Sequence, residues 1–152
     1  MANEIHLDYA SGNTVYAVVR NSAGQVWYPA GAVFESWGTN GHNADNYDIQ
    51  LTDRNGSRYA GNFDANIPAG RYTIQMFLQA GANPADSDEL IGGARIIWTG
   101  SAELTADKIL GNKAVQNKST GAIDYYDDDG QTVILTHTPT DGESSITRTP
   151  SS

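Results

Sequence analysis

The sequence is organised around one stretch, Arg71–Ala80, which reads RYTIQMFLQA. Apolar side chains occupy every second position of this stretch, at Tyr72, Ile74, Met76 and Leu78. An alternation of period two places such side chains on one face of a β-strand and the intervening residues on the other. The stretch therefore predicts a strand that buries one face in a hydrophobic core.

Turn residues separate this strand from similar runs on both sides. Asn55-Gly56 lies between two such runs and favours a type I′ hairpin turn, because both residues accept positive φ values. Gly92-Gly93 interrupts another run and predicts a bulge there. The polar stretch Gly38–Asn46 is typical of a surface loop. The other predicted strands are Thr14–Arg20, Gln25–Tyr28, Ala32–Trp37, Tyr47–Thr52, Ser57–Phe63 and Glu89–Trp98.

About seven short strands at this spacing predict an all-β domain, an immunoglobulin-like antiparallel β-sandwich, over residues 1–100. Residues 101–112 then form a linker. Within it, Ser101–Leu110 favours a short helix that Gly111 ends.

Residues 113–152 predict a small C-terminal β extension made of hairpins. The run Asp127-Asp128-Asp129-Gly130 lies between two strand-like stretches, and Asp-Gly at such a place favours a hairpin turn. The extension carries few apolar residues, too few to bury a core of its own. We therefore expect it to pack on the first domain or on another chain.

The charge and the apolar runs exclude several classes of partner. The chain has 18 acidic and 9 basic residues and a net charge of −9. No basic stripe is present, so we expect no nucleic-acid partner. No apolar run approaches the roughly 20 residues that span a bilayer, so we expect no membrane partner. Residues Met1–Glu4 lack the features of a secretory signal, which predicts synthesis in the cytoplasm.

The sequence lacks the motifs of common active sites. There is no cysteine, and the histidines, His6, His42 and His137, belong to no Gly-x-Ser-x-Gly or His-Glu-x-x-His motif. The acidic run Asp127–Asp129 lacks the alternating oxygen ligands and the later glutamate of an EF-hand calcium loop. A calcium site built with Asp45, Asp48, Asp86 or Asp88 stays an alternative. We predict a protein that is not an enzyme and that holds no cofactor and no metal.

The aromatic residues leave a second alternative, a carbohydrate-binding module. The chain has three tryptophans and eight tyrosines, which in principle suit a sugar-binding platform. Trp27, Trp37 and Trp98 lie within or at the ends of predicted strands, where packing is the ordinary role of such rings.

Several stretches, taken in order, resemble a known class of proteins. They are Val15–Glu35, Ala44–Leu51 (ADNYDIQL), Ile67–Tyr72 (IPAGRY), Phe77–Gly81 (FLQAG), Ile96–Gly100 (IIWTG), Lys113–Val115, Tyr125–Gly130 (YYDDDG), Val133–Thr136 (VILT) and Arg148–Pro150. This order resembles small proteins encoded among the virion genes of tailed bacteriophages and prophages. The C-terminal part resembles a short strand module found at the ends of phage tail, baseplate and neck-associated proteins. The resemblance rests on turns and aromatic residues over residues 14–150, without a catalytic signature.

The resemblance implies a non-enzymatic structural protein of the virion. The expected role is an adaptor or attachment component of the tail, baseplate or neck, present in multiple copies or as a homo-oligomer. The expected partners are other virion proteins. An alternative within the virion is a decoration protein on the capsid exterior that clamps the major capsid protein.

The expected mode of assembly is contact through exposed strand edges and the C-terminal extension. A specific contact of this kind buries about 1,200–2,000 Å². The predicted interface residues belong to the edges of the extension: Tyr125, Tyr126, Val133, Ile134, Leu135 and Arg148. The alternative is that these residues pack only against the chain's own first domain.

Overall fold

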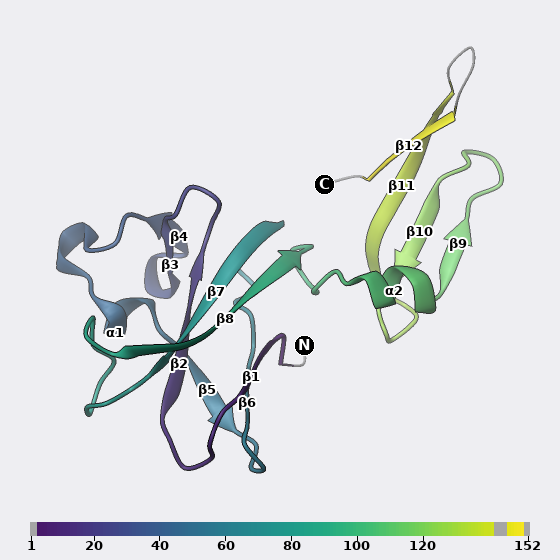
Figure 1. Cartoon of the computed structure of the whole chain (residues 1–152). Coiled ribbons are helices and arrows are strands. Elements are labelled where there is room, and N and C mark those ends of the chain that lie inside the picture. The colour runs from purple at the N-terminus through teal and green to yellow at the C-terminus, as the bar shows by residue number, and fades with distance from the viewer. Residues whose placement is uncertain (1–2, 142–145, 151–152) are drawn as a thin grey trace.

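The computed structural model of the chain describes residues 3–141 and 146–150 (Figure 1). These residues form an eight-stranded antiparallel sheet and a four-stranded antiparallel sheet, joined by a short segment with one helix. The predicted all-β fold with a C-terminal β extension is confirmed.

The elements follow one another along the chain with short connections. The large sheet contains β1 (Ile5–Asp8), β2 (Val15–Arg20), β3 (Val26–Tyr28), β4 (Val33–Glu35), β5 (Ile49–Asp53), β6 (Arg58–Gly61), β7 (Gly70–Leu78) and β8 (Glu89–Trp98). Its connections include the 3₁₀ turns η1 (Pro29–Gly31) and η2 (Thr39–Gly41) and the helical turn α1 (Ala44–Tyr47). Helix α2 (Ala106–Gly111) leads to the small sheet of β9 (Ala114–Gln116), β10 (Ile123–Tyr126), β11 (Val133–Asp141) and β12 (Ile146–Pro150).

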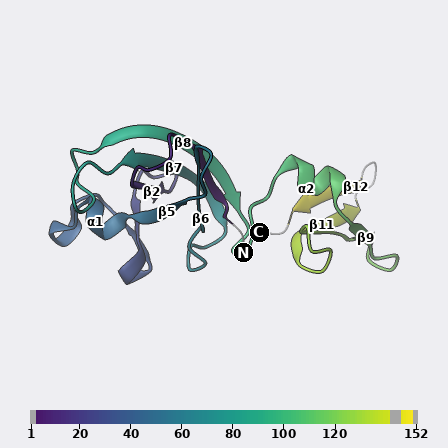
Figure 2. The ribbon, with the colours of Figure 1, turned by 90° about the horizontal axis from the view of Figure 1, so that it is seen from below.

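Strand β2 is the centre of the large sheet. It pairs with β7 along its whole length on one side. On its other side it pairs with β5 at its beginning and with β3 at its end, where Arg20 lies opposite Val26. The sheet continues from β7 to β8 and from β5 through β6 to β1. It curves so strongly that it nearly closes into a barrel (Figure 2).

The opening of the barrel is a seam between β1 and β8. In the described residues no backbone pairing joins these two strands. Their contact is made by side chains, because a Cβ atom at Gly92 would lie only 2.8 Å from Leu7 Cδ1. The predicted bulge occurs next to this glycine, where the register between β7 and β8 shifts at Met76 and Phe77. The missing side chain at position 92 thus lets β1 approach β8.

The interior of the barrel is the main hydrophobic core. The predicted apolar face of β7 supplies Tyr72, Ile74 and Met76 to it, and Trp27 and Trp98 are buried beside them. Both indole N–H groups are satisfied: Trp27 donates to Asp64 Oδ2 at 2.8 Å, and Trp98 donates to the carbonyl of Ile67 at 3.0 Å. Burial of apolar surface of this kind is the dominant stabilising contribution to a fold.

A second, smaller core lies on the outside of the barrel, under the segment 36–48. It contains Tyr16, Val18, Val26, Ala44 and Tyr47. This segment is more ordered than the expected loop, since Asn43 caps α1 and forms a reciprocal capping box with Asn46. Strand β2 is therefore covered on both faces, which explains why its first five residues are all buried.

Candidate interaction surfaces

The C-terminal sheet contains the residues that the sequence predicts at an interface. Its strands follow the order β9-β10-β11-β12, and the hairpin between β10 and β11 turns at Asp127–Gly130, where Gly130 has φ 65°. Asp129 closes this turn. Its carboxylate accepts hydrogen bonds from the Thr132 hydroxyl at 2.6 Å and from the backbone N–H groups of Thr132 and Gln131, both at 2.8 Å. These bonds, the hydroxyl of Thr132 first, lower the pKa of Asp129 to about 2.

Helix α2 is fastened to the end of this hairpin. Thr105 caps the helix by accepting a hydrogen bond from the N–H of Lys108. The ammonium group of Lys108 lies 2.7 Å from Asp127 Oδ1, and Asn112 donates to Asp128 Oδ1 at 2.8 Å. The acidic turn is thus a structural connection between α2 and the β10–β11 hairpin. Among the described residues no three acidic or histidine side chains are grouped so that they would hold a metal ion.

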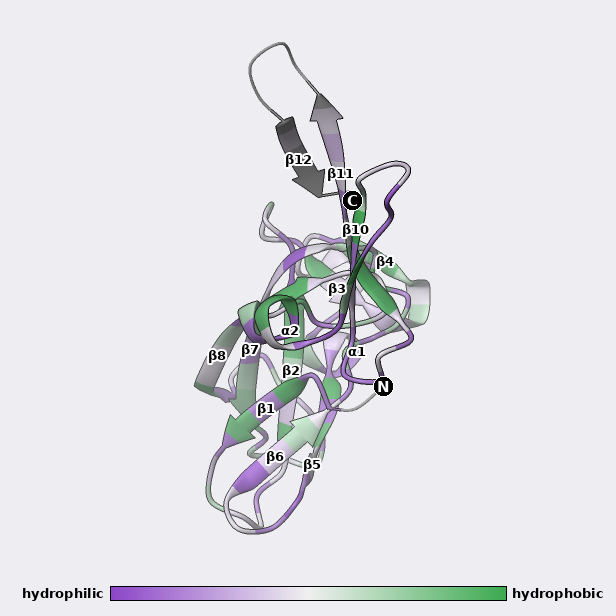
Figure 3. Ribbon diagram, turned by 90° about the vertical axis from the view of Figure 1, so that its right-hand side faces the viewer, coloured by the Kyte–Doolittle hydropathy of each residue, from purple (hydrophilic) through white to green (hydrophobic). Residues whose placement is uncertain are grey.

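The small sheet buries very little apolar surface. In the described part of the chain beyond Ala102, Ile134 is the one large hydrophobic residue that is buried, at 5% exposure. Leu110 at the end of α2 is 85% exposed, and Val115 and Val133 are exposed as well. The hydrophobic part of α2 is visible at the base of the small sheet (Figure 3). The segment therefore carries apolar surface that the chain itself leaves uncovered.

The predicted interface residues are divided among different surroundings. Tyr125 and Leu135 pair across β10 and β11, so they lie on one face of the small sheet. The ring of His137 packs against that of Tyr125, with 5.2 Å between the ring centres. Tyr126 lies on the opposite face, where the ammonium group of Lys113 is 4.1 Å from its ring centre. Such a cation–π contact covers the ring on that side.

The remaining three predicted residues differ in exposure. Val133 is exposed, whereas Ile134 is buried and has little surface to offer a partner. Arg148 lies in β12 opposite Pro139, but its side chain is outside the described part of the structure. The role of all six residues at an interface stays a prediction.

The positions of the sheet edges differ from the expectation. Strand β10, with Asp124–Tyr126, lies between β9 and β11 and is not an edge. Strand β11 pairs with β12 only over His137–Asp141, so Val133–Leu135 extend beyond this partner. The sequence does not reveal this arrangement, because it depends on the length of β12 and on which neighbour each hairpin strand selects.

A polar junction connects the two sheets. Glu103 forms an isolated antiparallel bridge with Trp98, and the N–H of Leu104 donates to the carbonyl of Ile97 at 2.8 Å. Burial raises the pKa of Glu103, while the nearby side chains of Lys108 and His6 act in the opposite direction. The junction is held by backbone bonds and charged groups, and no described side chain of the small sheet belongs to the hydrophobic core of the barrel.

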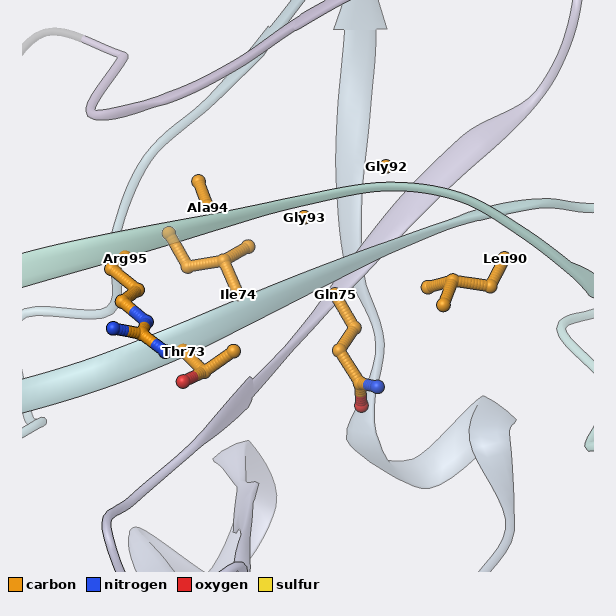
Figure 4. A pocket seen from close by; sticks show the side chains of 8 residues that line it. All are labelled: Thr73, Ile74, Gln75, Leu90, Gly92, Gly93, Ala94 and Arg95. Carbon is orange, nitrogen blue, oxygen red and sulfur yellow. The ribbon is translucent and has the colours of Figure 1, made fainter.

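A second exposed surface lies on the outside of β7 and β8, around Gly92-Gly93 (Figure 4). Thr73, Gln75, Leu90 and Arg95 point to the same side there, whereas Ala94 points to the other. The register places Arg20, Thr73 and Arg95 in one row across β2, β7 and β8. The glycine pair in the sequence indicates a bulge but gives no sign that Arg20 and Arg95 lie in one row on either side of Thr73.

The three tryptophans are packed against other groups of the chain. Trp27 and Trp98 are buried in the barrel. Trp37 is covered on the outside by the guanidinium group of Arg20, which lies 5.0 Å from the centre of its ring. It also packs on Tyr47, with 4.9 Å between the two ring centres. Its indole N–H donates to Asp86 Oδ2 at 3.3 Å. The ring of Trp37 thus attaches the segment 36–48 to the barrel.

The three histidines lie on different elements and form no common site. His6 is in β1 and His137 in β11. His42 Nδ1 lies 2.6 Å from Glu35 Oε1, which also accepts a hydrogen bond from the Tyr47 hydroxyl at 2.9 Å. The contact with His42 is the main reason why the pKa of Glu35 is lowered. This group joins the segment 36–48 to β4.

No protein family, no curated protein and no solved structure matches this chain. The described residues also contain no helix of the length and apolarity needed to cross a bilayer.

Proposed function

We propose that the protein is a non-enzymatic structural component that assembles with other proteins through its C-terminal sheet. The observation that supports this proposal is the contrast between the two sheets. The barrel has a core of fourteen buried residues, whereas Ile134 is the one large hydrophobic side chain that is buried among the described side chains of the small sheet. A sheet of this size without a core gains stability when a partner covers its apolar residues.

The exposed residues of this segment supply a surface for such a partner. Leu110, Val115 and Val133 together present aliphatic side chains on α2, β9 and β11. Complete burial of one such side chain stabilises a contact by roughly 1.5–3 kcal/mol. The strand β9 is also an edge of its sheet, which can pair with a strand of another chain.

The resemblance of the sequence supports a location in the virion of a tailed bacteriophage. We infer an adaptor or attachment role in the tail, baseplate or neck, in several copies per particle and in contact with other virion proteins. Such a role is carried out by binding surfaces alone. This role agrees with the contacts of the acidic turn and of His42, which connect elements of the chain to one another.

The experiment that tests this proposal is the analysis of virions made by the phage or induced prophage that encodes the chain. Mass spectrometry of purified particles is expected to detect the protein in multiple copies. Labelling with an antibody in negative stain is expected to mark the tail, baseplate or neck. Labelling of the capsid surface would contradict the tail role, and absence of the protein from particles would contradict the proposal as a whole.

A matched pair of variants tests the role of the C-terminal sheet. Val115→Asp changes an exposed valine of the edge strand β9, and Val33→Asp makes the same change in the edge strand β4 of the barrel. The two side chains are 42% and 46% exposed. Val115→Asp is expected to lower incorporation into particles about tenfold, the scale of a strong interface residue, and Val33→Asp to leave it unchanged. Equal incorporation of both variants would contradict assembly through this sheet.

A further inference from the structure

We propose that the free edge of β8 binds an extended segment of a partner protein as an additional antiparallel strand, with a carboxylate of the partner facing Arg95. Addition of a strand to an exposed sheet edge is a recurrent mode of peptide recognition. This surface belongs to the barrel and is separate from the C-terminal sheet, so the inference goes beyond the proposed function.

The edge of β8 that faces away from β7 is open. Among the described strands, β8 pairs only with β7. Gly93, Ala94 and Arg95 are three consecutive exposed residues in the middle of the strand. Ala94 is in register with the core residue Ile74 and points away from the outward side chains in Figure 4. A residue on that inner face is exposed only because no strand covers this part of the seam.

Backbone N–H and carbonyl groups along this edge point away from β7. The carbonyl of Ile97 accepts a hydrogen bond from Leu104 on the side away from β7. Because the hydrogen-bonding direction repeats every second residue, the N–H and carbonyl groups of Arg95 and Gly93 point to the same free side. In the described part of the chain no strand pairs with them there. Such groups are a template for another strand.

A short segment of the chain itself already pairs with the end of this edge. Glu103 forms an antiparallel bridge with Trp98, and Leu104 bonds to Ile97, so residues 103–104 are a short strand-like addition to β8. The chain then leaves the edge and enters α2 after Thr105. A partner strand would continue in the same antiparallel direction from the point where Leu104 departs.

The side chains beside the edge carry positive charge. Arg95 and the neighbouring Arg71 form no ion pair with the described residues. With Arg20 they place three of the nine basic residues of an acidic chain on one face. Glu103 of the chain's own addition lines the same depression as both Arg71 and Arg95. Glu103 lies in register with the buried Trp98, and the side chains that act on its carboxylate are those of Lys108, His6 and Glu4, so it does not neutralise Arg95. A partner strand with a carboxylate at an outward position would be attracted to Arg95.

The apolar residues of β8 further define the partner. Ile97 and Leu90 are exposed on either side of Arg95 along the strand. The glycine pair between Arg95 and Leu90 leaves room for side chains of the added strand. The surface therefore fits an extended segment whose outward positions carry a carboxylate flanked by apolar residues.

The experiment uses the complete chain and a short synthetic peptide. In this peptide threonine occupies every second position, and the positions between are a glutamate flanked by valines. Titration of the peptide into ¹⁵N-labelled protein is expected to shift the amide signals of β8 and to protect the N–H groups of Gly93 and Arg95 from exchange. The matched peptide with lysine in place of glutamate is expected to bind about tenfold more weakly, because its charge has the same sign as Arg95.

Variants separate the charge from the fold. Arg95→Glu is expected to weaken binding of the acidic peptide about tenfold, and Arg95→Gln, which keeps the side-chain length, to weaken it less. Lys118→Glu makes the same type of charge reversal at an exposed turn between β9 and β10 and is expected to leave binding within about twofold. Circular dichroism and thermal unfolding of each variant verify the fold.

Four results would overturn the inference. These are equal binding of the acidic and the basic peptide, signal shifts away from β8, and undiminished binding of a peptide that is N-methylated at alternate residues. The fourth is protection of the same β8 amides in the protein alone through self-association, which would identify a second copy as the occupant. Because Val115→Asp leaves the β8 edge intact, it is expected to bind the acidic peptide like the unmodified chain, whatever its incorporation into particles.

Discussion

The hydroxyl group of Tyr59 is one of the groups that hold the loop between β1 and β2 in place. The ring of Tyr59 is buried in the main core, and its oxygen lies 3.1 Å from the carbonyl of Ala10 and 3.0 Å from that of Asn13. The same oxygen accepts a hydrogen bond from the N–H of Asn13 at 3.0 Å. These bonds join two segments that are more than forty residues apart in the sequence. The hydroxyl thus anchors the loop to β6, and the carboxylate of Asp53, which accepts hydrogen bonds from Ser11 and Gly12, anchors it to β5.

Replacement of this hydroxyl gives a direct test. Tyr59→Phe is expected to reduce the free energy of unfolding by about 1–3 kcal/mol, because the N–H of Asn13 loses its partner in a partly buried place. Tyr9→Phe is the control, since Tyr9 packs on the same core without a side-chain hydrogen bond among the described residues. Urea unfolding followed by tryptophan fluorescence measures both variants. Equal stability of the two would contradict the anchoring role.

The carboxylate of Asp129 stabilises the β10–β11 turn by accepting hydrogen bonds from Gln131 and Thr132. Thr132→Val removes the hydroxyl that contributes most to its lowered pKa. The pKa of Asp129 is then expected to rise from about 2 towards its ordinary value of 3.8. Titration of the carboxyl ¹³C signal measures the change. Thr138→Val, an exposed residue of β11 away from the turn, is expected to leave that pKa in place, and an unchanged pKa in Thr132→Val would show that the hydroxyl has no such effect.

At the scale of single elements, the segment 101–104 belongs to the barrel and not to the small sheet. Ala102 is buried, and Glu103 and Leu104 extend the edge of β8. A chain that ends at Leu104 should therefore keep the stability of the barrel. A chain that ends at Gly100 removes this addition and exposes the end of β8.

The two truncations form a matched pair. The chain 1–104 is expected to unfold within about 3 °C of the barrel transition of the complete protein, and the chain 1–100 about 4–8 °C lower, for a loss of about 1 kcal/mol. Differential scanning calorimetry measures both. If 1–104 unfolds far below the complete protein, the barrel depends on the small sheet, and the division at the polar junction would be incorrect.

Elements with strong local signals could be predicted from the sequence. Asn55 and Gly56 both adopt φ 65°, as the Asn-Gly signal requires, but Ser57 also has a positive φ of 64°, so the connection between β5 and β6 is longer than the expected two-residue turn. The alternation in Arg71–Ala80 indicates both β7 and the face that it buries. Helix α2 begins at Ala106, later than the expected helical stretch, because Thr105 provides the cap.

Other elements depend on distant partners and were not predictable. Strand β1 has only four residues, Ile5–Asp8, and exists because it pairs with β6, more than fifty residues later. The segment 38–46 looks like a polar loop, yet it carries η2 and α1 because Tyr47 and Trp37 attach it to β2. The seam beside β8, and with it the proposed binding edge, results from the curvature of the complete sheet, which no local pattern encodes.

At the scale of the whole molecule, hydrogen-bonded carboxylates make stability depend on pH. Asp53 accepts bonds from the N–H groups of Gly12 at 2.7 Å and Asn55 at 2.8 Å, and these bonds hold its pKa below the ordinary 3.8. A lowered pKa in the folded state stabilises the protein above the unfolded pKa, and this contribution is lost as the pH falls through the folded pKa. Asp48 and Glu103, whose pKa values burial raises, act with the opposite sign.

A single variant isolates this contribution from the opposing groups. Asp53→Asn is expected to be less stable than the unmodified chain at pH 7, and the difference is expected to shrink as the pH falls below the ordinary pKa of 3.8 and through the lowered pKa of Asp53. Urea midpoints measured at several pH values test this. A difference that stays constant down to the lowest pH would contradict the role of the carboxylate charge.

The pairing of β2 with strands from three parts of the chain has a consequence for the order of folding. The barrel cannot assemble until β7 is present, because β2 needs β3, β5 and β7 as neighbours. The small sheet contains only consecutive strands, and sheets with short sequence separation form faster than sheets with distant pairings. All three tryptophans, Trp27, Trp37 and Trp98, belong to the barrel. Refolding kinetics followed by tryptophan emission would therefore report the slow closure of the barrel and leave the rapid formation of the C-terminal hairpins unseen.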